Sequence, residues 1–488
     1  MKSKIVETGK HTIIYGISSA FQSLIGFVLL PLLTKFYSAE EFGVYSLLIL
    51  ISTLAGAFFF FGSSSTLNRY FFESDTEEHK KSIVSTTFLI TLIGALLQII
   101  FGFIFSNKLS ILLTGSGDFS NHVFLILLAS AIGMLMNFNF VVIRLEKKSK
   151  VFVQLNIFSN LLNLGLVYYL LVFRYAGIYA PIIGLLIGNL VAFVISYFHV
   201  KKYFGEYINK IMIREYLFFG LSTTINGITY YFLDWIDRYF VKQYASLADV
   251  GIYSMGYKIG MIIHVIMIIP FSMIWSTVRM QYAKDEDNTK FVSKVFSYYT
   301  IIGLFIVLST SIFAKELLFI FSGREEYYIA YKVVPIIMIA HLIYGYINIV
   351  DFGIIISKKL YFFYLTFIVA SGLNAFLNYI FVPKYGYIAA AYITLLTYLF
   401  CSSVIYLIGR KYYRLTIDWK RVISPFILVA LILYISENIA FSLIVNIAIK
   451  ITVIGLVGVL IYSLWLTKSE KLIARNIPVK IKQYLGIS

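Results

Sequence analysis

Residues 36–46 of this chain read FYSAEEFGVYS, and residues 244–254, which begin 208 positions later, read YASLADVGIYS. Each copy lies between two long apolar runs. A polar segment that returns at a fixed offset between hydrophobic stretches indicates a duplicated membrane unit. Internal repeats of this kind are typical of transporters, whose two halves enclose a substrate and rock against each other.

The duplication extends beyond this motif. Residues 109–115 match residues 317–323 at the same offset of 208. Each half holds six apolar spans, an even number, so the second half should enter the membrane in the same orientation as the first, as parallel repeats do. We therefore predict an N-terminal six-helix lobe, a C-terminal six-helix lobe, and two additional helices with a basic cytoplasmic tail, over residues 1–208, 209–410 and 411–488.

The composition indicates an integral membrane protein. Of the 488 residues, 60% are hydrophobic and 13% are charged, which is far more apolar than a typical soluble domain. The apolar runs are about 20–25 residues long, enough for a helix rising about 1.5 Å per residue to cross roughly 30 Å of hydrocarbon. We predict an all-α polytopic membrane protein with about 14 transmembrane helices, near residues 12–35, 43–68, 82–105, 121–143, 151–173, 178–200, 215–241, 250–275, 294–314, 332–356, 360–382, 386–409, 421–438 and 443–466.

The basic residues are distributed asymmetrically along these spans. With both termini placed in the cytoplasm, the inner segments hold 30 Lys and Arg and the outer segments hold 9. The positive-inside rule favours this orientation. Topology therefore accounts for the formal charge of +17, and the sequence predicts no nucleic-acid partner. We expect the first helix to stay in the membrane without cleavage of a signal peptide.

The sequence predicts no metal site, cofactor or enzyme. Cys401 is the only cysteine, and the six histidines include no pair at the i, i+4 spacing of a helical metal site. Gly9 and Lys10 form the one Gly-Lys pair, and they lack the rest of a phosphate-binding loop, so ATP is not expected as the direct driver. An ion gradient, the membrane potential or downstream consumption of the product is expected to supply the energy.

Several short motifs, taken in order, resemble the Wzx-type oligosaccharide and polysaccharide flippases. They are residues 37–45, residues 68–71, Arg144 with residues 147–148, residues 237–238 with 250–254, and residues 374–391. That family lies in the MOP superfamily, which also contains the multidrug and toxin extruders and the lipid II flippases. The resemblance covers nearly the whole chain. It implies a two-lobed helical transporter that moves undecaprenyl-diphosphate-linked glycans across the bacterial cytoplasmic membrane for surface polysaccharide biosynthesis. The partners that it implies are membrane lipids, glycosyltransferases and a polysaccharide polymerase.

Four charged residues in or beside the seventh and eighth predicted spans, Asp234, Asp237, Arg238 and Lys258, are candidates for function. A charge inside a span costs roughly 2.5–3.5 kcal/mol on insertion scales. Asp234 and Lys258 lie at similar depth on adjacent helices, which allows them to pair. At the 208-residue offset the first half carries uncharged residues, namely Gly26, Leu29, Leu30 and Leu50. This asymmetry favours a functional role, and the competing interpretation is an ion pair that only fastens two helices.

A diphosphate needs Arg or Lys in a water-filled cavity, where charge-assisted hydrogen bonds are strong. Lys258 and Arg69 are the leading candidates, although Arg69 would equally serve as a cytoplasmic anchor at the end of the second span. Amides and rings on the helices expected to line the cleft are candidates for sugar contacts, and these are Gln22, Asn226, Tyr230, Tyr231 and His264. A membrane histidine such as His264 is more often a structural group than a proton relay.

Two other functions remain open. A multidrug and toxin extruder coupled to H⁺ or Na⁺ would use carboxylates in the lobes and an aromatic or acidic cavity for cations. The two spans beyond twelve and the cationic Lys258 favour the flippase instead. A membrane-embedded glycan polymerase or acyltransferase would be favoured by a large outer loop with clustered Arg or His, but the longest predicted outer loop, residues 315–331, holds two basic residues.

Overall fold

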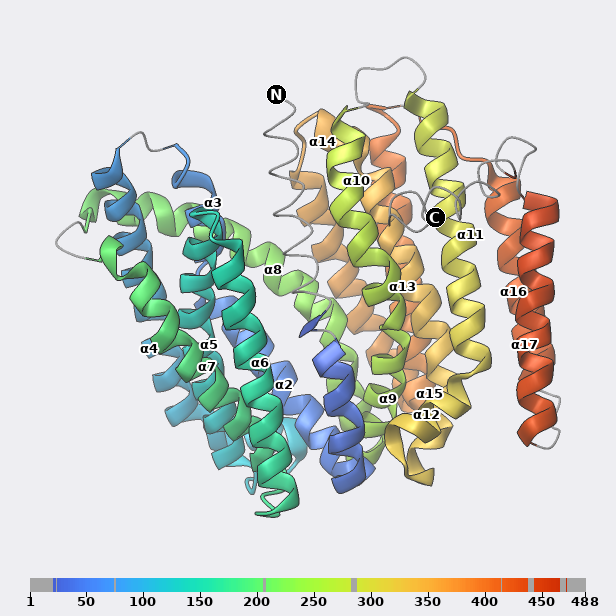
Figure 1. Cartoon of the computed structure of the whole chain (residues 1–488), viewed down its shortest axis with the longest axis horizontal. Helices are drawn as coiled ribbons and strands as arrows, with labels where there is room; N and C mark the ends of the chain where they lie inside the picture. The colour runs from blue at the N-terminus through green and yellow to red at the C-terminus, as the bar shows by residue number, and fades with distance from the viewer. Residues whose placement is uncertain are drawn as a thin grey trace, which may run out of the picture.

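The helices of the computed structural model form two bundles that stand side by side (Figure 1). The structure describes residues 21–22, 24–73, 76–204, 208–281, 288–413, 415–437, 443–465 and 471. The first bundle consists of α2 (Ala39–Phe59), α3 (Ser63–Tyr70), α4 (Glu77–Thr114), α5 (Ser120–Leu145), α6 (Ser149–Val172) and α7 (Tyr179–Val200). The second consists of α9 (Leu247–Gly260), α10 (Ile269–Gln281), α11 (Asn288–Ile312), α12 (Ala314–Ser322), α13 (Val333–Val350), α14 (Phe352–Ile356) and α15 (Tyr361–Gly409).

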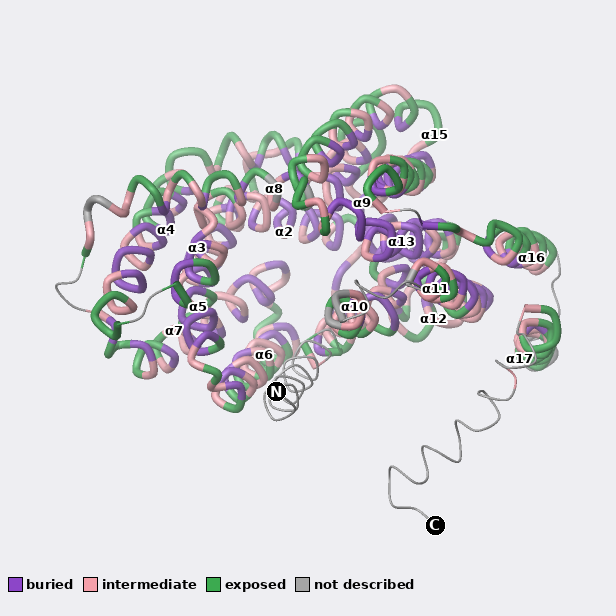
Figure 2. Tube along the Cα trace, turned by 90° about the horizontal axis from the view of Figure 1, so that it is seen from above, coloured by how far each residue is buried: buried purple, intermediate pink, exposed green. Residues whose placement is uncertain are grey.

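Three long helices, α8 (Lys210–Tyr244), α16 (Trp419–Glu437) and α17 (Leu443–Leu460), lie outside these two sets. The helix α8 crosses diagonally from the first bundle to the second in Figure 1, and it contacts α3 and α4 in one and α9 and α15 in the other. α16 and α17 pack against α11 at the edge of the second bundle. Figure 2 shows them standing apart, with many exposed residues. The lobe boundaries at residues 208 and 410 stay predictions.

The prediction of an all-α polytopic membrane protein is confirmed. The described residues form helices and no strand, and eleven of these helices are long and apolar enough to cross a membrane. One of the eleven, α15, covers two predicted spans and is broken at Gly386, where φ is 61° and ψ is −153°. The predicted first and seventh spans correspond to the shorter helix Leu24–Phe36 and to α8. Residues 12–20 of the first span lie outside the described residues.

The repeated motif begins a helix in the same way in each half. Ser38 caps the N-terminus of α2 by accepting a hydrogen bond from the backbone N–H of Glu41, at 3.2 Å. Ser246 caps α9 by accepting one from Asp249, at 3.0 Å. Both pairs are 208 residues apart. A serine cap with an acidic residue in the first turn satisfies exposed backbone N–H groups and complements the helix dipole.

The two copies of the motif also pack against each other. A Cβ atom at Gly43 would lie 2.0 Å from the carbonyl oxygen of Leu247, and one at Gly251 would lie 1.9 Å from that of Ala39. Gly251 is the repeat counterpart of Gly43, and Leu247 is that of Ala39. The same contact is therefore made twice, once in each direction. Glycine permits this close approach of two helix backbones because it has no Cβ. We call the end where α2 and α9 meet the closed face; it lies at the bottom of Figure 1.

Further hydrogen bonds join the bundles at the closed face. The hydroxyl of Thr34, on the helix Leu24–Phe36, donates to the carbonyl oxygen of Phe321 at 2.7 Å. The hydroxyl of Tyr327, in the 3₁₀ helix η3 (Glu325–Lys332), donates to the carbonyl oxygen of Tyr37 at 3.2 Å. These contacts hold the two bundles together at one end, and the candidate site lies farther along the bundle.

Candidate functional site

A polar stripe runs along α6. Asn156, Ser159, Asn160 and Asn163 follow one another at i, i+3, i+4 and i+7, and this spacing places them on one face of the helix. All four line a cavity of 360 Å³ inside the first bundle. Polar side chains in a membrane span are costly unless they meet other polar groups, water or a ligand. The stripe therefore indicates a hydrated or ligand-binding space.

Amides from two neighbouring helices face the same cavity. Asn137 comes from α5 and Asn189 from α7, and Arg144 lies at the end of α5. Gln22, which the sequence placed on a helix lining the cleft between the lobes, also lines this space inside the first bundle. Cavity walls built from five asparagines, a glutamine and an arginine offer donors and acceptors at many positions and a single positive charge.

A second cavity of 580 Å³ adjoins the first. The two share lining residues, including Asn137, Arg144 and Asn189. Its other walls come from hydroxyl-bearing residues of α2, such as Thr53, and from α8, which contributes Tyr231. Among the described residues that line the two cavities none is acidic. We call the combined space the amide cavity.

Some of the amide groups retain hydrogen-bonding capacity. The Nδ2 of Asn160 donates to the backbone carbonyl of Asn156 at 2.8 Å and to its Oδ1 at 3.2 Å. The Nδ2 of Asn189 donates to the carbonyl of Ala129 at 3.0 Å. The Oδ1 of Asn163 is buried and accepts no hydrogen bond from the residues that the structure describes. An acceptor of this kind is satisfied when water or a ligand hydroxyl reaches it.

A second polar cluster lies within the second bundle, centred on Asp237 of α8. This buried carboxylate accepts hydrogen bonds from the hydroxyl of Tyr253 at 2.8 Å, from Nδ2 of Asn378 at 2.9 Å and from the hydroxyl of Thr394. The Nδ2 of Asn378 also contacts Oδ1 of Asn374 at 3.0 Å, and its own Oδ1 is buried without a partner among the described residues. The cluster therefore brings three hydrogen-bond donors to one buried carboxylate, and the amide oxygens of Asn374 and Asn378 lie beside them.

Asp234 and Arg238 are buried one turn apart on α8. Asp234 accepts hydrogen bonds from the hydroxyl groups of Tyr257 and, at 3.4 Å, Tyr398. The Nε of Arg238 donates to Ser254 at 3.2 Å, and its guanidinium lies 4.6 Å from the ring centre of Tyr257. In the described part of the chain, neither aspartate forms an ion pair with Arg238 within 4.0 Å. The sequence allowed a direct salt bridge between these charges. In the structure they are surrounded by hydroxyl groups, amide groups and aromatic rings instead.

Lys258 does not pair with Asp234, which is a correction to the sequence-based interpretation. The two residues interact electrostatically, but no ion pair within 4.0 Å joins Lys258 to any described carboxylate. The side chain of Lys258 is exposed, although Tyr257 and Ile259 beside it are buried. α9 contacts α2, α8, α13 and α15 and lies at the centre of the view in Figure 2, so little of its surface is left for lipid.

The other predicted site residues are dispersed. Arg69 is exposed on α3, where its guanidinium lies 4.6 Å from the ring centre of Phe219 and 3.7 Å from a carboxylate oxygen of Glu73. Arg69 does not line the amide cavity. His264 begins the short π-helix η2 (His264–Ile268), and its ring centre lies 5.7 Å from that of His341. The side chains of Asn226 and Tyr230 lie outside the described residues.

Glu146 organises the loops beside Arg144, outside the membrane spans. Its carboxylate pairs with the ammonium groups of Lys148, at 2.9 Å, and Lys202, and accepts a hydrogen bond from Tyr203 at 2.8 Å. Burial alone would raise the pKa of Glu146, but the hydrogen bonds from Lys202, Lys148 and Tyr203 outweigh burial and lower the pKa. The ionised carboxylate fastens the end of α5 to the 3₁₀ turn η1 (Lys201–Tyr203) after α7.

Residues 8–276, more than half of the chain, match the family model described as polysaccharide biosynthesis protein. The chain belongs to this family. The resemblance to the Wzx-type flippases of the MOP superfamily is thereby confirmed. None of the curated proteins matches the chain.

Solved structures of two transporter types share the fold of this polysaccharide biosynthesis protein. The lipid II flippase MurJ, in an inward closed conformation, is 17% identical with a TM-score of 0.75, and the match covers 92% of this chain and 99% of that one. An inward-facing multidrug resistance MATE family transporter of the MOP superfamily is 14% identical with a TM-score of 0.66, over 80% of this chain and 94% of that one. The chain is therefore a multi-pass membrane protein with a transporter fold.

The sequence analysis did not identify the asparagines of the amide cavity as site residues. The signal was present, because the polar positions of the span 151–173 recur at helical spacing and so predict a polar face. The charged residues inside the predicted seventh and eighth spans favoured a site on α8 and α9 instead. Asn137 and Asn189 are isolated amides in their own helices, and only the packing of α5 and α7 beside α6 brings them to the stripe.

Proposed function

We propose that this protein flips undecaprenyl-diphosphate-linked oligosaccharide repeat units across the bacterial cytoplasmic membrane by alternating access. The amide cavity is the observation that carries the proposal. A glycan presents many hydroxyl groups, and each seeks a hydrogen-bond partner once it leaves water. Asparagines that project into a cavity from three helices supply both donors and acceptors for them.

Charge in the cavity matches an anionic lipid-linked substrate. Arg144 lines both parts of the amide cavity, and a guanidinium binds phosphate oxygens through charge-assisted hydrogen bonds. Lys258, an exposed residue of α9 that is not part of the described cavity lining, offers a second cation. Carboxylates or aromatic rings would hold a cationic drug; the described lining includes aromatic rings such as Tyr231, but no carboxylate to neutralise a cation. This favours the flippase over the alternative, a multidrug and toxin extruder-type antiporter.

The packing of the bundles supports alternating access. The α2–α9 contact seals the closed face, which is the outer side in the predicted topology with both termini cytoplasmic. Substrate would enter the amide cavity from the cytoplasmic side, and separation of α2 from α9 would release it outward. Glycosyltransferases would supply the substrate and a polymerase would consume it. We assign the protein no catalytic activity.

We further propose that the Asp237 cluster couples this movement to H⁺ or Na⁺. A buried carboxylate beside the hydroxyl groups of Tyr253 and Thr394 suits either a proton or a hard monovalent cation, because carboxylate and hydroxyl oxygens can coordinate both. Asp237 lies on α8, the helix that extends into both bundles, so a change in its charge acts on the element that connects them. Protonation or cation binding would reduce the cost of burying this carboxylate, which forms no ion pair within 4.0 Å among the described residues and is stabilised by hydrogen bonds alone.

The experiment replaces Lys258 and Asn160 separately in cells that depend on this protein for surface glycan. We expect lipid-linked repeat units to accumulate on the cytoplasmic side in Lys258→Ala and Asn160→Leu, with each variant present in the membrane at the normal level. Normal surface glycan in Lys258→Ala would remove that lysine from the site, and normal glycan in Asn160→Leu would refute the assignment of the amide cavity.

A further inference from the structure

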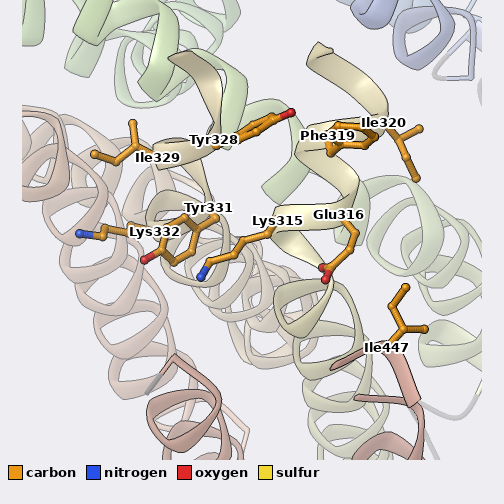
Figure 3. A pocket seen from close by; sticks show the side chains of 9 residues that line it. All are labelled: Lys315, Glu316, Phe319, Ile320, Tyr328, Ile329, Tyr331, Lys332 and Ile447. Atoms are coloured by element: carbon orange, nitrogen blue, oxygen red, sulfur yellow. The ribbon is translucent and has the colours of Figure 1, made fainter. Parts of the chain in front are cut away.

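A groove with a mixed apolar and cationic lining lies at the closed face, away from the amide cavity. It has a volume of 800 Å³ and is bounded by α12, η3 and α17 (Figure 3). Phe319 and Ile320 of α12 and Ile329 of η3 are exposed apolar residues on its walls, and Ile447 contributes from α17. An apolar surface of this kind, at the end of a membrane bundle, is suited to acyl chains.

Two lysines line the same groove. Figure 3 shows Lys332 and Lys315 flanking Tyr331, and the ammonium group of Lys315 lies 4.5 Å from the ring centre of Tyr331. Among the described residues, neither lysine has a carboxylate within 4.0 Å. The one acidic residue of the lining, Glu316, already pairs with Lys450 of α17. The groove therefore keeps two uncompensated positive charges.

The position of these lysines is unusual for the predicted topology. Outer segments hold nine Lys and Arg in all, and three of them, Lys315, Arg324 and Lys332, fall within 18 residues. The positive-inside rule disfavours basic residues on that side, so topology does not account for the cluster. Arg324 pairs with Glu326 at 3.3 Å, which leaves the two groove lysines for another anion.

We propose that the groove binds an anionic glycerophospholipid of the outer leaflet. Its phosphate would lie between Lys315 and Lys332, where the hydroxyl of Tyr331 supplies a further donor (Figure 3). Its acyl chains would cover Phe319, Ile329 and Ile447. The bound lipid would connect α17 to α12 and η3, beside the Lys450–Glu316 ion pair, and so hold the two additional helices against the second bundle. This inference does not depend on the proposed function.

Native mass spectrometry of the full chain in detergent tests the proposal, with phosphatidylglycerol and phosphatidylcholine of identical acyl chains as probes. The wild-type protein should bind phosphatidylglycerol in preference to phosphatidylcholine. The double variant Lys315→Gln/Lys332→Gln should bind phosphatidylglycerol roughly 30-fold more weakly, since each lysine near a lipid headgroup contributes about a factor of five. Lys108→Gln/Lys242→Gln, which changes two closed-face lysines outside the groove, should bind like the wild type.

A second variant keeps the charges and fills the groove. Ile329→Trp should reduce phosphatidylglycerol binding several-fold while leaving the melting temperature of the delipidated protein near that of the wild type. Equal binding of the two lipids by the wild type, or undiminished phosphatidylglycerol binding by the double lysine variant, would overturn the proposal. Displacement of phosphatidylglycerol by undecaprenyl phosphate would overturn it as well, since the groove would then receive the polyprenyl carrier.

Discussion

Replacing Gly251 with alanine is expected to open the closed face. The new Cβ would lie 1.9 Å from the carbonyl oxygen of Ala39, whereas ordinary van der Waals contact begins at 3.4 Å. The backbones of α2 and α9 must therefore separate by about 1.5 Å, because two packed helix backbones cannot absorb the overlap otherwise. The reciprocal contact of Gly43 with Leu247 would be lost with it.

Overpacking of this kind costs about 1–3 kcal/mol. The cost falls on the conformation in which α2 and α9 touch, so it shifts the equilibrium toward the opposite conformation by roughly 5- to 150-fold. Gly372→Ala is the matched control, because a Cβ at Gly372 meets nothing within 4 Å. Both variants gain about 1 kcal/mol of intrinsic helix propensity, so their difference isolates the helix contact.

Labelling of a single cysteine measures this shift. Cys401, the only cysteine, is first replaced by alanine, and Thr53 of the amide cavity is replaced by cysteine. A membrane-impermeant maleimide is then added on the side of the closed face. Labelling should be faster in Gly251→Ala by at least fivefold and unchanged in Gly372→Ala. Equal labelling of the two would refute the reasoning that the glycine contact seals this end.

The remaining predictions concern the amide cavity, the Asp237 cluster and the loop carboxylate. Asn160→Leu should lower the flipping rate at least tenfold in proteoliposomes, whereas Gln154→Leu, an amide of the same helix outside the cavity, should leave it unchanged; equal rates would argue against the cavity. Asp237→Asn should make the rate independent of imposed H⁺ and Na⁺ gradients, and a retained response to either would place coupling elsewhere. Because the folded pKa of Glu146 is lowered from its ordinary value of 4.5, its stabilising contribution is present above that value and is lost as the pH falls through the folded pKa. The melting temperature of Glu146→Gln should therefore depend less on pH below about 4.5 than that of the wild type, and parallel curves would contradict this.

Local chemistry explains why much of the fold was predictable. The caps at Ser38 and Ser246 use partners three residues away, and the helices after them are predominantly apolar beyond their acidic first turn. Gly115 and Gly323, which match at the repeat offset, both end their helices in the left-handed conformation, with φ of 89° and 60°. Such signals lie within one turn of the chain, so the sequence alone carries them.

The site was predictable only in part, because charge inside a span is visible in a sequence and the orientation of a side chain is not. Asp234, Asp237 and Arg238 were identified by their cost in a membrane, and the structure gives each of them polar partners. The pairing of Asp234 with Lys258 that the sequence allowed does not form among the described residues, since the carboxylate of Asp234 accepts hydrogen bonds from tyrosine hydroxyls of α9 and α15 instead. Arg69 lies against Phe219 of α8 and not in the amide cavity, because the rotation of α3 about its axis is set by the helices that pack against it.

The sequence by itself determined the duplication, the membrane setting and the positions of the helices, because these follow from hydrophobicity and from contacts within one turn. Tertiary structure alone decided that the repeated motifs meet at Gly43 and Gly251, and that Asn137 and Asn189 join the stripe on α6. Both depend on how distant helices turn toward each other. That choice is set by the packing of whole helix faces, which no single segment of the chain specifies.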